Sequence, residues 1–357
     1  MRVTLSAKVP DGAGLRWRPL LLAMSGLALA LTGCGATAAT HTAAKKVPLI
    51  VYAAEGYDAN TVAAFQAKTG IPTQLVDDST GPLLAKIQAE VNNPQWGLLW
   101  VDGDEAFAAL DKQHYLLRGF EPKADWTAAA RRVLPPDHSY IPTGFTAMPA
   151  LVYNSAVVSS PPTSWQQLLQ PQWKNAVGMN NPAVSGPTYP FVAGMMQNLG
   201  GVAQGEAYFS QLKANGLKIY PTNKPTLAAL IQGQIKVALV QNSAGIGAAY
   251  QDKGLKLAYL NPVTLLPSVI GIDGKASAQE QVEAKQFVNF VFSAAGQHQR
   301  MIGDPHGDSL FWPVVNGYPQ LATVPPFSSI PYQVLNAYTW GPREATIDEW
   351  FSNNIVA

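Results

Sequence analysis

The sequence predicts an α/β fold built from parallel-rich sheets that are covered by helices on both faces. Short apolar, β-favouring segments alternate along the chain with segments of helical period, which is the pattern of parallel sheets. The length of 357 residues allows one large or two medium lobes. The pattern restarts after about residue 145, which favours two lobes.

The first half contains three predicted strands, each followed by a predicted helix. Asp58 and Asp104 are suited to cap the first and third helices, and Pro82 fits the first position of the second helix. The predicted strands are 49–53, 72–76 and 98–101. Ligands of such sheets bind outside the carboxyl ends of the strands, so the residues that follow each strand are the candidates for a site.

The second half repeats the alternation with more strands. Its predicted helices are 187–200, 205–214, 226–232 and about 279–292. Its predicted strands are 150–154, 176–179, 218–220, 236–240 and 265–272. Residues 304–331 are rich in proline and are expected to form loops before the terminal helices.

Composition excludes several classes of protein. A hydrophobic fraction of 47% with 13% charged residues indicates a globular chain and excludes a disordered one. The formal net charge is +1 and the sequence has no basic blocks, so no nucleic-acid partner is expected. A single cysteine excludes an internal disulfide and a thiolate metal cluster.

The N-terminus has the organisation of an export signal. Residues 1–18 carry four basic residues against one acid, and the stretch from Leu20 to Leu31 is uncharged and too short to span a bilayer. This stretch ends in Leu31-Thr32-Gly33-Cys34, which resembles a bacterial lipobox. The resemblance implies that residues 1–33 are a signal peptide and that Cys34 is acylated. The alternative is a buried cysteine that follows an apolar run by chance.

The segment after the lipobox has no periodicity. Residues 34–46, rich in alanine and threonine, are predicted to be a tether. A chain exported and anchored in this way works in the periplasm or on the outer face of the cytoplasmic membrane, with the lipid as its only membrane contact.

Two similar helix starts are candidate anion sites. Ser79-Thr80-Gly81-Pro82 and Ser185-Gly186-Pro187-Thr188 each place a glycine directly before a proline and supply hydroxyl groups. The free N–H groups and the positive end of the helix dipole at such a start favour an anion. The alternative is that both are ordinary N-caps, in which serine and threonine are common.

Acidic residues follow the first and third predicted strands. Glu55, with Tyr57 close by, follows the first strand, and Asp102 ends the third. Helix capping and the helix dipole account for Asp104 and Glu105, but less well for Glu55 and Asp102. Carboxylates beside anion donors suit a zwitterion, which has an anionic end and an ammonium.

Five segments resemble the solute-binding proteins of bacterial ABC importers, of the ferric-ion and 2-aminoethylphosphonate type. They are VYAAEGYDANTVAAFQAKTGI (51–71), DDSTGPLLAKIQAE (77–90), LVYNSAVV (151–158), TSWQQLLQPQWKNAVGMNNP (163–182) and FVNFVFSAAGQ (287–297). No single segment is decisive, but five in order after a lipobox are specific to the class. They do not specify the ligand.

The resemblance implies a type II periplasmic-binding fold, in which two α/β lobes joined by crossing hinge strands close on a ligand like a clamshell. The first lobe is expected at 47–142 plus 268–357 and the second at 143–267. Such a protein is expected to be a monomer without a cofactor or catalytic activity, and to deliver a small molecule to ABC permease subunits.

The resemblance leaves the ligand open between a phosphonate, a phosphorylated small molecule and ferric iron. Iron binders of the family have an adjacent tyrosine pair, whereas this sequence has none, and only Tyr189 lies near the expected place. The five histidines are scattered without ligand spacing, so no metal site is expected. Asn242, just after a strand, is a candidate amide contact or, equally, a turn residue.

A secreted hydrolase is the alternative from another class. It requires a nucleophile with a base, or a metal. The sequence contains no GxSxG and no HExxH, and the one cysteine is assigned to lipid. We therefore expect a binding protein.

Overall fold

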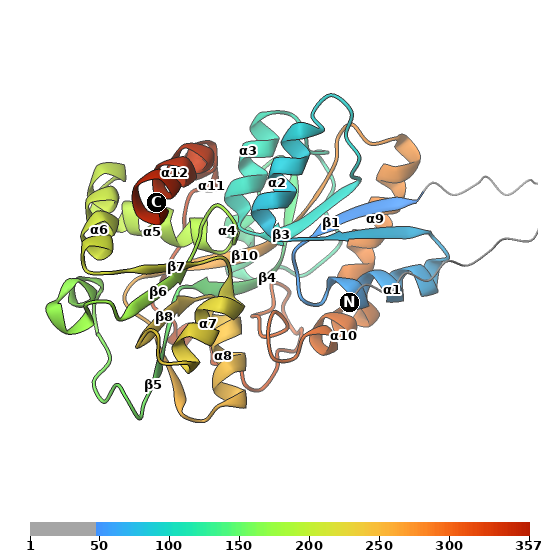
Figure 1. Ribbon diagram of the computed structural model, residues 1–357. Coiled ribbons are helices and arrows are strands. Elements are labelled where there is room, and N and C mark those ends of the chain that lie inside the picture. Colours follow the sequence, from blue (N-terminus) through green and yellow to red (C-terminus); the bar gives the residue numbers. More distant parts are fainter. Residues whose placement is uncertain (1–47) are drawn as a thin grey trace, which may run out of the picture. The chain divides into compact units, whose positions relative to one another are not determined.

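The structure, a computed structural model, describes residues 48–357 (Figure 1). The predicted signal peptide, the lipid site at Cys34 and the tether at 34–46 lie outside the described residues. No helix within 48–357 has the length and apolarity needed to cross a bilayer.

The first sheet has six strands in the order β11-β10-β3-β1-β2, with β4 paired to β10. β1 is parallel to β2 and β3, whereas β10 is antiparallel to β3 and β4. Its strands are β1 (Leu49–Ala53), β2 (Thr73–Asp77), β3 (Leu98–Asp102), β4 (Tyr140–Met148), β10 (Val263–Ile272) and β11 (Tyr332–Gln333).

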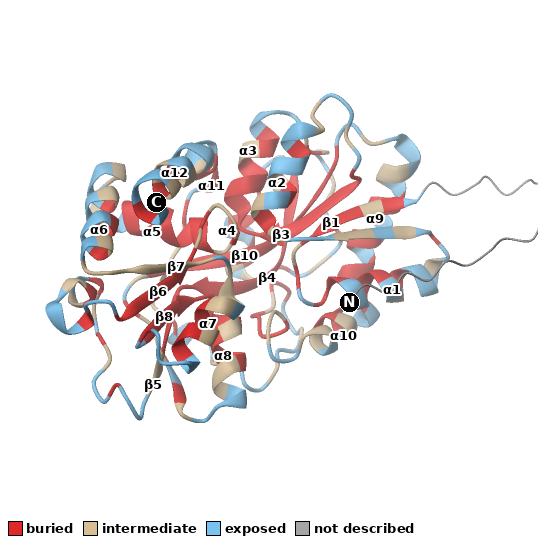
Figure 2. Cartoon of the chain, in the orientation of Figure 1, coloured by how far each residue is buried: buried red, intermediate tan, exposed pale blue. Residues whose placement is uncertain are grey.

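Helices cover both faces of the first sheet (Figure 1). α2 (Thr80–Ala89) and α3 (Asp104–Lys112) lie on one face. The other face carries α1 (Asp58–Thr69), α9 (Ala278–Val291) and α10 (Ala294–Gly303). The strands between these layers are largely buried, as Figure 2 shows, which explains why β1 is apolar throughout and β3 is apolar up to its last residue, Asp102.

The second sheet has five strands in the order β7-β6-β8-β5-β9. β6 is parallel to β7 and β8, and β5 is antiparallel to β8 and β9. The strands are β5 (Ala150–Asn154), β6 (Val177–Asn180), β7 (Lys218–Tyr220), β8 (Val237–Val240) and β9 (Leu255–Ala258). The associated helices are α5 (Thr188–Leu199), α6 (Val202–Ala214), α7 (Asn223–Ile231) and α8 (Asn242–Gln251).

The chain passes between the two sheets twice, on neighbouring antiparallel strands. β4 leads directly into β5, and β9 leads into β10, while β4 and β10 pair from Thr264↔Met148 to Gly271↔Tyr140. The pairing shifts between Ser268 and Val269, so that Thr143 has no partner in the register. These are the crossing strands of the predicted fold. The lobe boundaries at 142 and 267 fall inside them and remain a prediction.

Several predicted helix starts move by a few residues. Asp58 and Asp104 are the first residues of α1 and α3 and not their N-caps, which are Tyr57 and Gly103. Gly103 has a φ of 96°, a value that glycine adopts without steric cost. α2 begins at Thr80, two residues before the proline expected to open it, because Ser79 already has the extended backbone of a cap.

Short helices complete the chain. The region 304–331 is loop apart from one short turn of helix, as its prolines predict. The remaining α-helices are α4 (Ala128–Val133), α11 (Ala337–Trp340) and α12 (Glu344–Phe351). The 3₁₀ segments are Trp165–Leu169, Pro171–Trp173, Phe327–Ser329 and Gly341–Arg343, and Ser352–Val356 is a π-helix.

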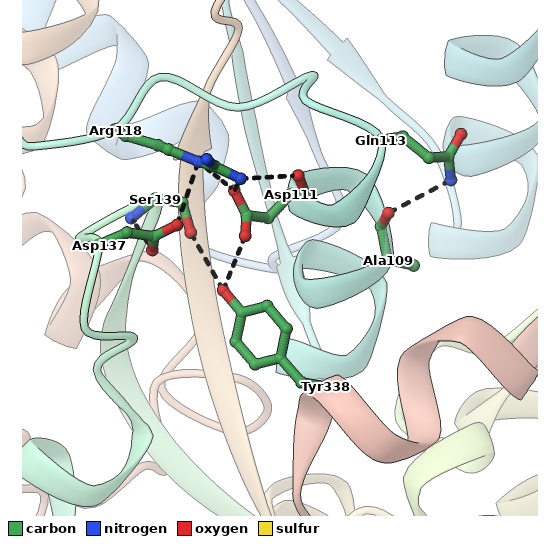
Figure 3. A network of polar contacts seen from close by, with 7 residues as sticks. All are labelled: Ala109, Asp111, Gln113, Arg118, Asp137, Ser139 and Tyr338. Carbon is green, nitrogen blue, oxygen red and sulfur yellow. Dashed lines mark hydrogen bonds and ion pairs between the residues drawn. The ribbon is translucent and has the colours of Figure 1, made fainter.

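A polar network fastens α11 to α3, and Figure 3 shows it from close by. Asp111 on α3 accepts hydrogen bonds from Arg118 Nε at 2.8 Å and from the Tyr338 hydroxyl at 2.9 Å. Arg118 also pairs with Asp137 at 3.1 Å, just before β4. We call these four residues the Asp111 network. It joins the C-terminal segment to the first sheet.

Candidate functional site

The two sheets meet through a hydrogen bond between residues that follow buried strands. Gln241, directly after β8, donates from Nε2 to Asp102 Oδ2 at 2.9 Å and to Thr146 Oγ1 at 3.1 Å. Asp102 ends β3 in the first sheet, and all three side chains are buried. The carboxyl ends of strands from both sheets therefore meet in one buried polar region between the sheets, which we call the cleft, as the open-sheet rule predicts.

Glu55 lies in the same cleft and is almost completely buried. Only 3% of its surface is exposed, and its Oε1 accepts a hydrogen bond from Ser268 Oγ at 2.5 Å. Burial raises the pKa of Glu55 well above its usual range, and the nearby carboxylates of Asp102 and Asp308 raise it further. Burial, followed by the charge of Asp308, likewise raises the pKa of Asp102.

Asp308, on the loop after α10, completes a group of three carboxylates. Its Oδ2 accepts a hydrogen bond from the Gly56 backbone N–H at 2.8 Å. Burial raises its pKa to about 6 although this hydrogen bond opposes the shift. We call Glu55, Asp102 and Asp308 the cleft carboxylates. Their shared negative charge is expensive to bury unless a cation joins them.

Further acids border the cleft on the side of the first sheet. Burial, and then the charge of Asp77, raises the pKa of Asp58 to about 7. A cavity of about 440 Å³ is lined here by Glu55, Asp58, Asp77, Asp78 and Ser79, together with small residues. This cavity therefore has an acidic wall.

The two predicted helix starts touch each other. The Gly81 N–H donates to the Val184 carbonyl at 3.3 Å. A Cβ atom added at Gly186 would lie 2.4 Å from Thr80 Oγ1, so the backbone of the second start packs directly against the first. Thr80, Gly81 and Gly186 also line a second cavity of about 470 Å³. The contact uses the Gly81 donor that the sequence assigned to an anion.

The second helix start keeps an unused donor. Thr188 is fully buried, and its Oγ1 has no hydrogen-bond partner. The Ser185 Oγ accepts a long hydrogen bond of 3.4 Å from Asn180 Nδ2. Ser79, in contrast, is partly exposed and makes no side-chain capping bond to α2. Neutral donors thus gather on the side of the second sheet.

Asn242 and Tyr189 are held by other parts of the protein. Asn242 Oδ1 accepts a hydrogen bond from the Ala147 N–H on β4 at 2.8 Å, which leaves its Nδ2 as a buried atom without a partner. The Tyr189 hydroxyl donates to the Trp340 carbonyl at 2.6 Å. Burial raises the pKa of Tyr189 far above its usual value, so the phenolate that iron would require is disfavoured.

Several polar residues of the cleft were not predicted from the sequence. Gln241 follows β8 directly and could have been found by the criterion that identified Asn242. Asp308, Ser268 and Arg300 lie at no strand end that faces the cleft, and no signal in the sequence marks them. Within residues 48–357 no group of three or more His, Cys, Asp or Glu side chains is arranged to hold a metal ion.

Two α/β sheets joined by paired crossing strands, with a polar cleft at their strand ends, define a type II periplasmic-binding fold. A family model described as bacterial extracellular solute-binding protein matches residues 60–325. The chain belongs to this family, and it is the solute-binding component of an ABC importer.

Three relatives illustrate the similarity. A curated protein from Salmonella paratyphi A, named putative 2-aminoethylphosphonate-binding periplasmic protein, is 24% identical over 240 residues, which are 66% of this chain and 68% of that protein. The periplasmic binding protein P5PA has a TM-score of 0.76 at 19% identity and matches 87% of this chain and 100% of its own. AfuA from Actinobacillus pleuropneumoniae, solved with fructose-6-phosphate, has a TM-score of 0.74 at 17% identity, over 87% of this chain and 98% of its own.

Proposed function

We propose that this protein captures a small zwitterion that carries an ammonium and a phosphonate or phosphate, with 2-aminoethylphosphonate as the leading candidate. The observation that carries the proposal is the polarity of the cleft. The cleft carboxylates Glu55, Asp102 and Asp308 belong to the side of the first sheet. The side of the second sheet offers the neutral donor Thr188 Oγ1 and the start of α5.

The carboxylates require a cationic end on the ligand. Asp102 and Asp308 each raise the pKa of Glu55, which means that the negative charges repel one another. An ammonium placed among them relieves this repulsion and gains charge-assisted hydrogen bonds of about 1.5–3 kcal/mol each. A purely anionic ligand gains nothing from them, so we favour a zwitterion over a simple phosphate ester.

The anionic end is assigned to the helix starts. Ser185, Gly186 and Thr188 precede or begin α5, where N–H groups and the helix dipole favour an anion. Ser79, Thr80 and Gly81 stand opposite at the start of α2. Because Gly81 and Val184 are hydrogen-bonded, a ligand of this kind must separate the two starts or lie beside their contact.

Calorimetry on the purified protein tests the ligand class. We expect binding of 2-aminoethylphosphonate, weaker binding of ethylphosphonate, which lacks the amine, and weaker binding of ethanolamine, which lacks the anion. Clear binding of a neutral sugar, with no heat from any phosphonate or sugar phosphate, would contradict the zwitterion. NMR of the recovered ligand should find it unchanged, since we propose no catalytic activity.

Ferric iron is the second candidate ligand, since one solved relative by fold is the iron-bound HitA from Pseudomonas aeruginosa, with a TM-score of 0.70 at 21% identity. Addition of ferric citrate should give no visible phenolate-to-iron band, because the Tyr189 phenol is buried and hydrogen-bonded. A strong band that disappears in Tyr189→Phe would support iron instead.

We further propose that Cys34 is acylated and that the mature protein works as a lipid-anchored monomer which delivers its ligand to the permease. The proposal rests on the signal-like N-terminus and the lipobox. Cys34→Ser should release folded protein from the membrane fraction of its own host. A wild-type protein that is already unmodified and fully released would contradict the anchor.

A further inference from the structure

Arg300 is a fully buried cation that makes no ion pair within residues 48–357. It projects from α10, where its Nη1 donates to the Thr143 carbonyl at 2.7 Å and its Nη2 donates to the Tyr57 hydroxyl at 3.1 Å. Its Nε has no partner. A buried guanidinium without a counter-charge costs free energy, so other neighbouring groups must stabilise the charge of Arg300.

Aromatic rings enclose the guanidinium. Its Cζ lies 4.3 Å from the ring centroid of Phe311, 4.8 Å from that of Tyr57 and 5.7 Å from that of Trp100. These faces attract a cation and keep the planar group in one orientation. Arg300 is therefore held rigidly, and its two hydrogen bonds fix the Tyr57 hydroxyl and the Thr143 carbonyl.

Hydroxyl groups connect Arg300 to a cleft carboxylate. The Tyr57 hydroxyl lies 3.4 Å from Ser268 Oγ, and Ser268 Oγ donates to Glu55 Oε1 at 2.5 Å. The chain Arg300–Tyr57–Ser268–Glu55 thus runs from a cation to a carboxylate through two hydroxyls. Such a chain polarises the Ser268 hydroxyl that donates to Glu55, and it fixes the orientation of the Glu55 carboxylate.

The same hydroxyls lie at the irregularity of the crossing strands. Thr143, which has no partner in the register of β4 with β10, presents its carbonyl to Arg300 and its hydroxyl to Ser268 Oγ at 2.9 Å. Trp100 Nε1 donates to Thr143 Oγ1 and to Ser268 Oγ, both at 3.2 Å. The orientation of Glu55 is consequently linked to the point where the chain passes between the sheets.

We infer that Arg300 is a positioning residue, which acts through Tyr57 and Ser268 to hold Glu55 toward the ammonium of the ligand and to join it to the crossing strands. The inference rests on the proposed zwitterionic ligand for its binding readout. It also has a readout that requires no ligand, because the hydrogen bond from Ser268 favours the ionised form of Glu55.

The pH at which Glu55 ionises measures this chain directly. The charged and titratable groups that surround Glu55 are Asp102 on β3, Asp308 on the loop after α10, Tyr57 and Asp58 at the start of α1, and Arg300 on α10. The Glu55 carboxyl can be followed by NMR in protein labelled with ¹³C-glutamate and assigned with Glu55→Gln.

The test uses Ser268→Ala, Tyr57→Phe and Arg300→Lys in the purified protein. Ser268→Ala removes the donor to Glu55, Tyr57→Phe removes the link to Arg300, and lysine keeps the charge of Arg300 but cannot make both hydrogen bonds as a planar fork. Each variant should make Glu55 ionise at a higher pH. Each should also reduce the preference for 2-aminoethylphosphonate over ethylphosphonate by about tenfold.

Tyr208→Phe is the matched control. Its hydroxyl is also buried and donates to a carbonyl, that of Trp165 at 2.8 Å, but on α6 behind the second sheet. It should lower the melting temperature without changing the titration of Glu55 or the ligand preference.

The outcomes separate this inference from the proposed ligand. If the three variants, like the control, lose only stability while Glu55 titrates as in the wild type, Arg300 is a core residue and the inference is wrong. If no phosphonate binds but the variants shift the titration of Glu55, the positioning role stands and the proposed ligand is wrong.

Discussion

The cleft carboxylates and the Asp111 network are two buried acidic groups that differ in their charged partners. Asp111 is as buried as Glu55, at 3% exposure each, yet it receives hydrogen bonds directly from Arg118 and Tyr338. Arg118 itself is partly exposed and keeps water on one side. In the cleft, Arg300 reaches Glu55 through the Tyr57 and Ser268 hydroxyls and forms no ion pair with it, and the charge of Arg300 also acts on Asp102 from a distance.

The difference separates a structural network from a binding site. A buried carboxylate with direct, charged partners is satisfied and contributes to stability. Buried carboxylates that repel one another reduce stability, and such a conflict is expected where a ligand supplies the missing charge. The comparison therefore predicts that changes in the cleft alter binding, whereas changes in the Asp111 network alter stability.

The largest expected effect comes from blocking the contact between the two helix starts. In Gly81→Ala the new Cβ would lie 2.2 Å from the Ala183 carbonyl oxygen, so the starts can no longer meet. We expect overpacking of this kind to weaken ligand binding by roughly tenfold to a hundredfold, on the 1–3 kcal/mol scale for inserted methyl groups. The clash should also lower the melting temperature, because overpacking of this size destabilises the folded state, so affinity is compared on the folded protein.

Gly254→Ala is the control for that substitution. Its nearest atom is the side-chain oxygen of Asp252 at 3.1 Å, which can move aside. Calorimetry measures the ligand affinity of both variants, and thermal unfolding measures their melting temperatures. Wild-type affinity in Gly81→Ala would mean that the contact between the helix starts plays no part in capture.

Neutralising a cleft carboxylate should affect binding nearly as much. Asp102→Asn or Glu55→Gln should weaken 2-aminoethylphosphonate binding by about tenfold to a hundredfold, because one charge-assisted hydrogen bond to the ammonium is lost. The loss should be smaller for ethylphosphonate. The exposed Glu349→Gln on α12 is the matched control and should bind like the wild type. Equal losses of affinity for both ligands would mean that these carboxylates do not contact an ammonium.

The reverse result is expected in the Asp111 network. Asp111→Ala leaves the Tyr338 hydroxyl and the Arg118 guanidinium without their shared acceptor. The free energy of unfolding should fall by about 1–3 kcal/mol, while the folded protein keeps its affinity. Urea unfolding followed by calorimetry on the folded fraction tests both statements. A change in ligand preference would contradict the separation of the two regions.

The smallest effect concerns pH. The pKa values of Asp58 and Asp308 are raised to about 7 and about 6, so these groups hold protons in the folded protein that the unfolded chain has released. Their stabilising contribution is present below about pH 4 and is lost as the pH rises through 6 and 7. The ligand-free protein should therefore become less stable from about pH 4 to 7, by up to about 1.4 kcal/mol per pH unit for each proton.

Ligand should reverse part of this loss. An ammonium favours the ionised carboxylates, so affinity for 2-aminoethylphosphonate should fall as the pH drops below about 6. Asp58→Asn should flatten the pH dependence of the melting temperature without the ligand. A stability that rises steadily from about pH 4 to 7 would show that other groups dominate.

Local chemistry in the sequence was enough to predict the elements and the places where a site could form. An apolar segment with β-favouring residues identified β1 residue for residue, because a buried parallel strand must be apolar and short. Glu55 and Asp102, expected after the first and third strands, lie close enough for their charges to interact, because strand ends of an open sheet lie at one edge. Their role as ligand contacts stays a prediction.

The partners of these side chains were decided only by tertiary structure. Ser268 and Arg300 are 32 residues apart and lie more than 200 residues from Glu55, so no local pattern relates them. The use of the Gly81 N–H by Val184, and of the Tyr189 hydroxyl by Trp340, depends on how close the packed elements approach. Distances and burial determine which carboxylate is satisfied and which is left for a ligand, and both arise only when the two sheets are packed together.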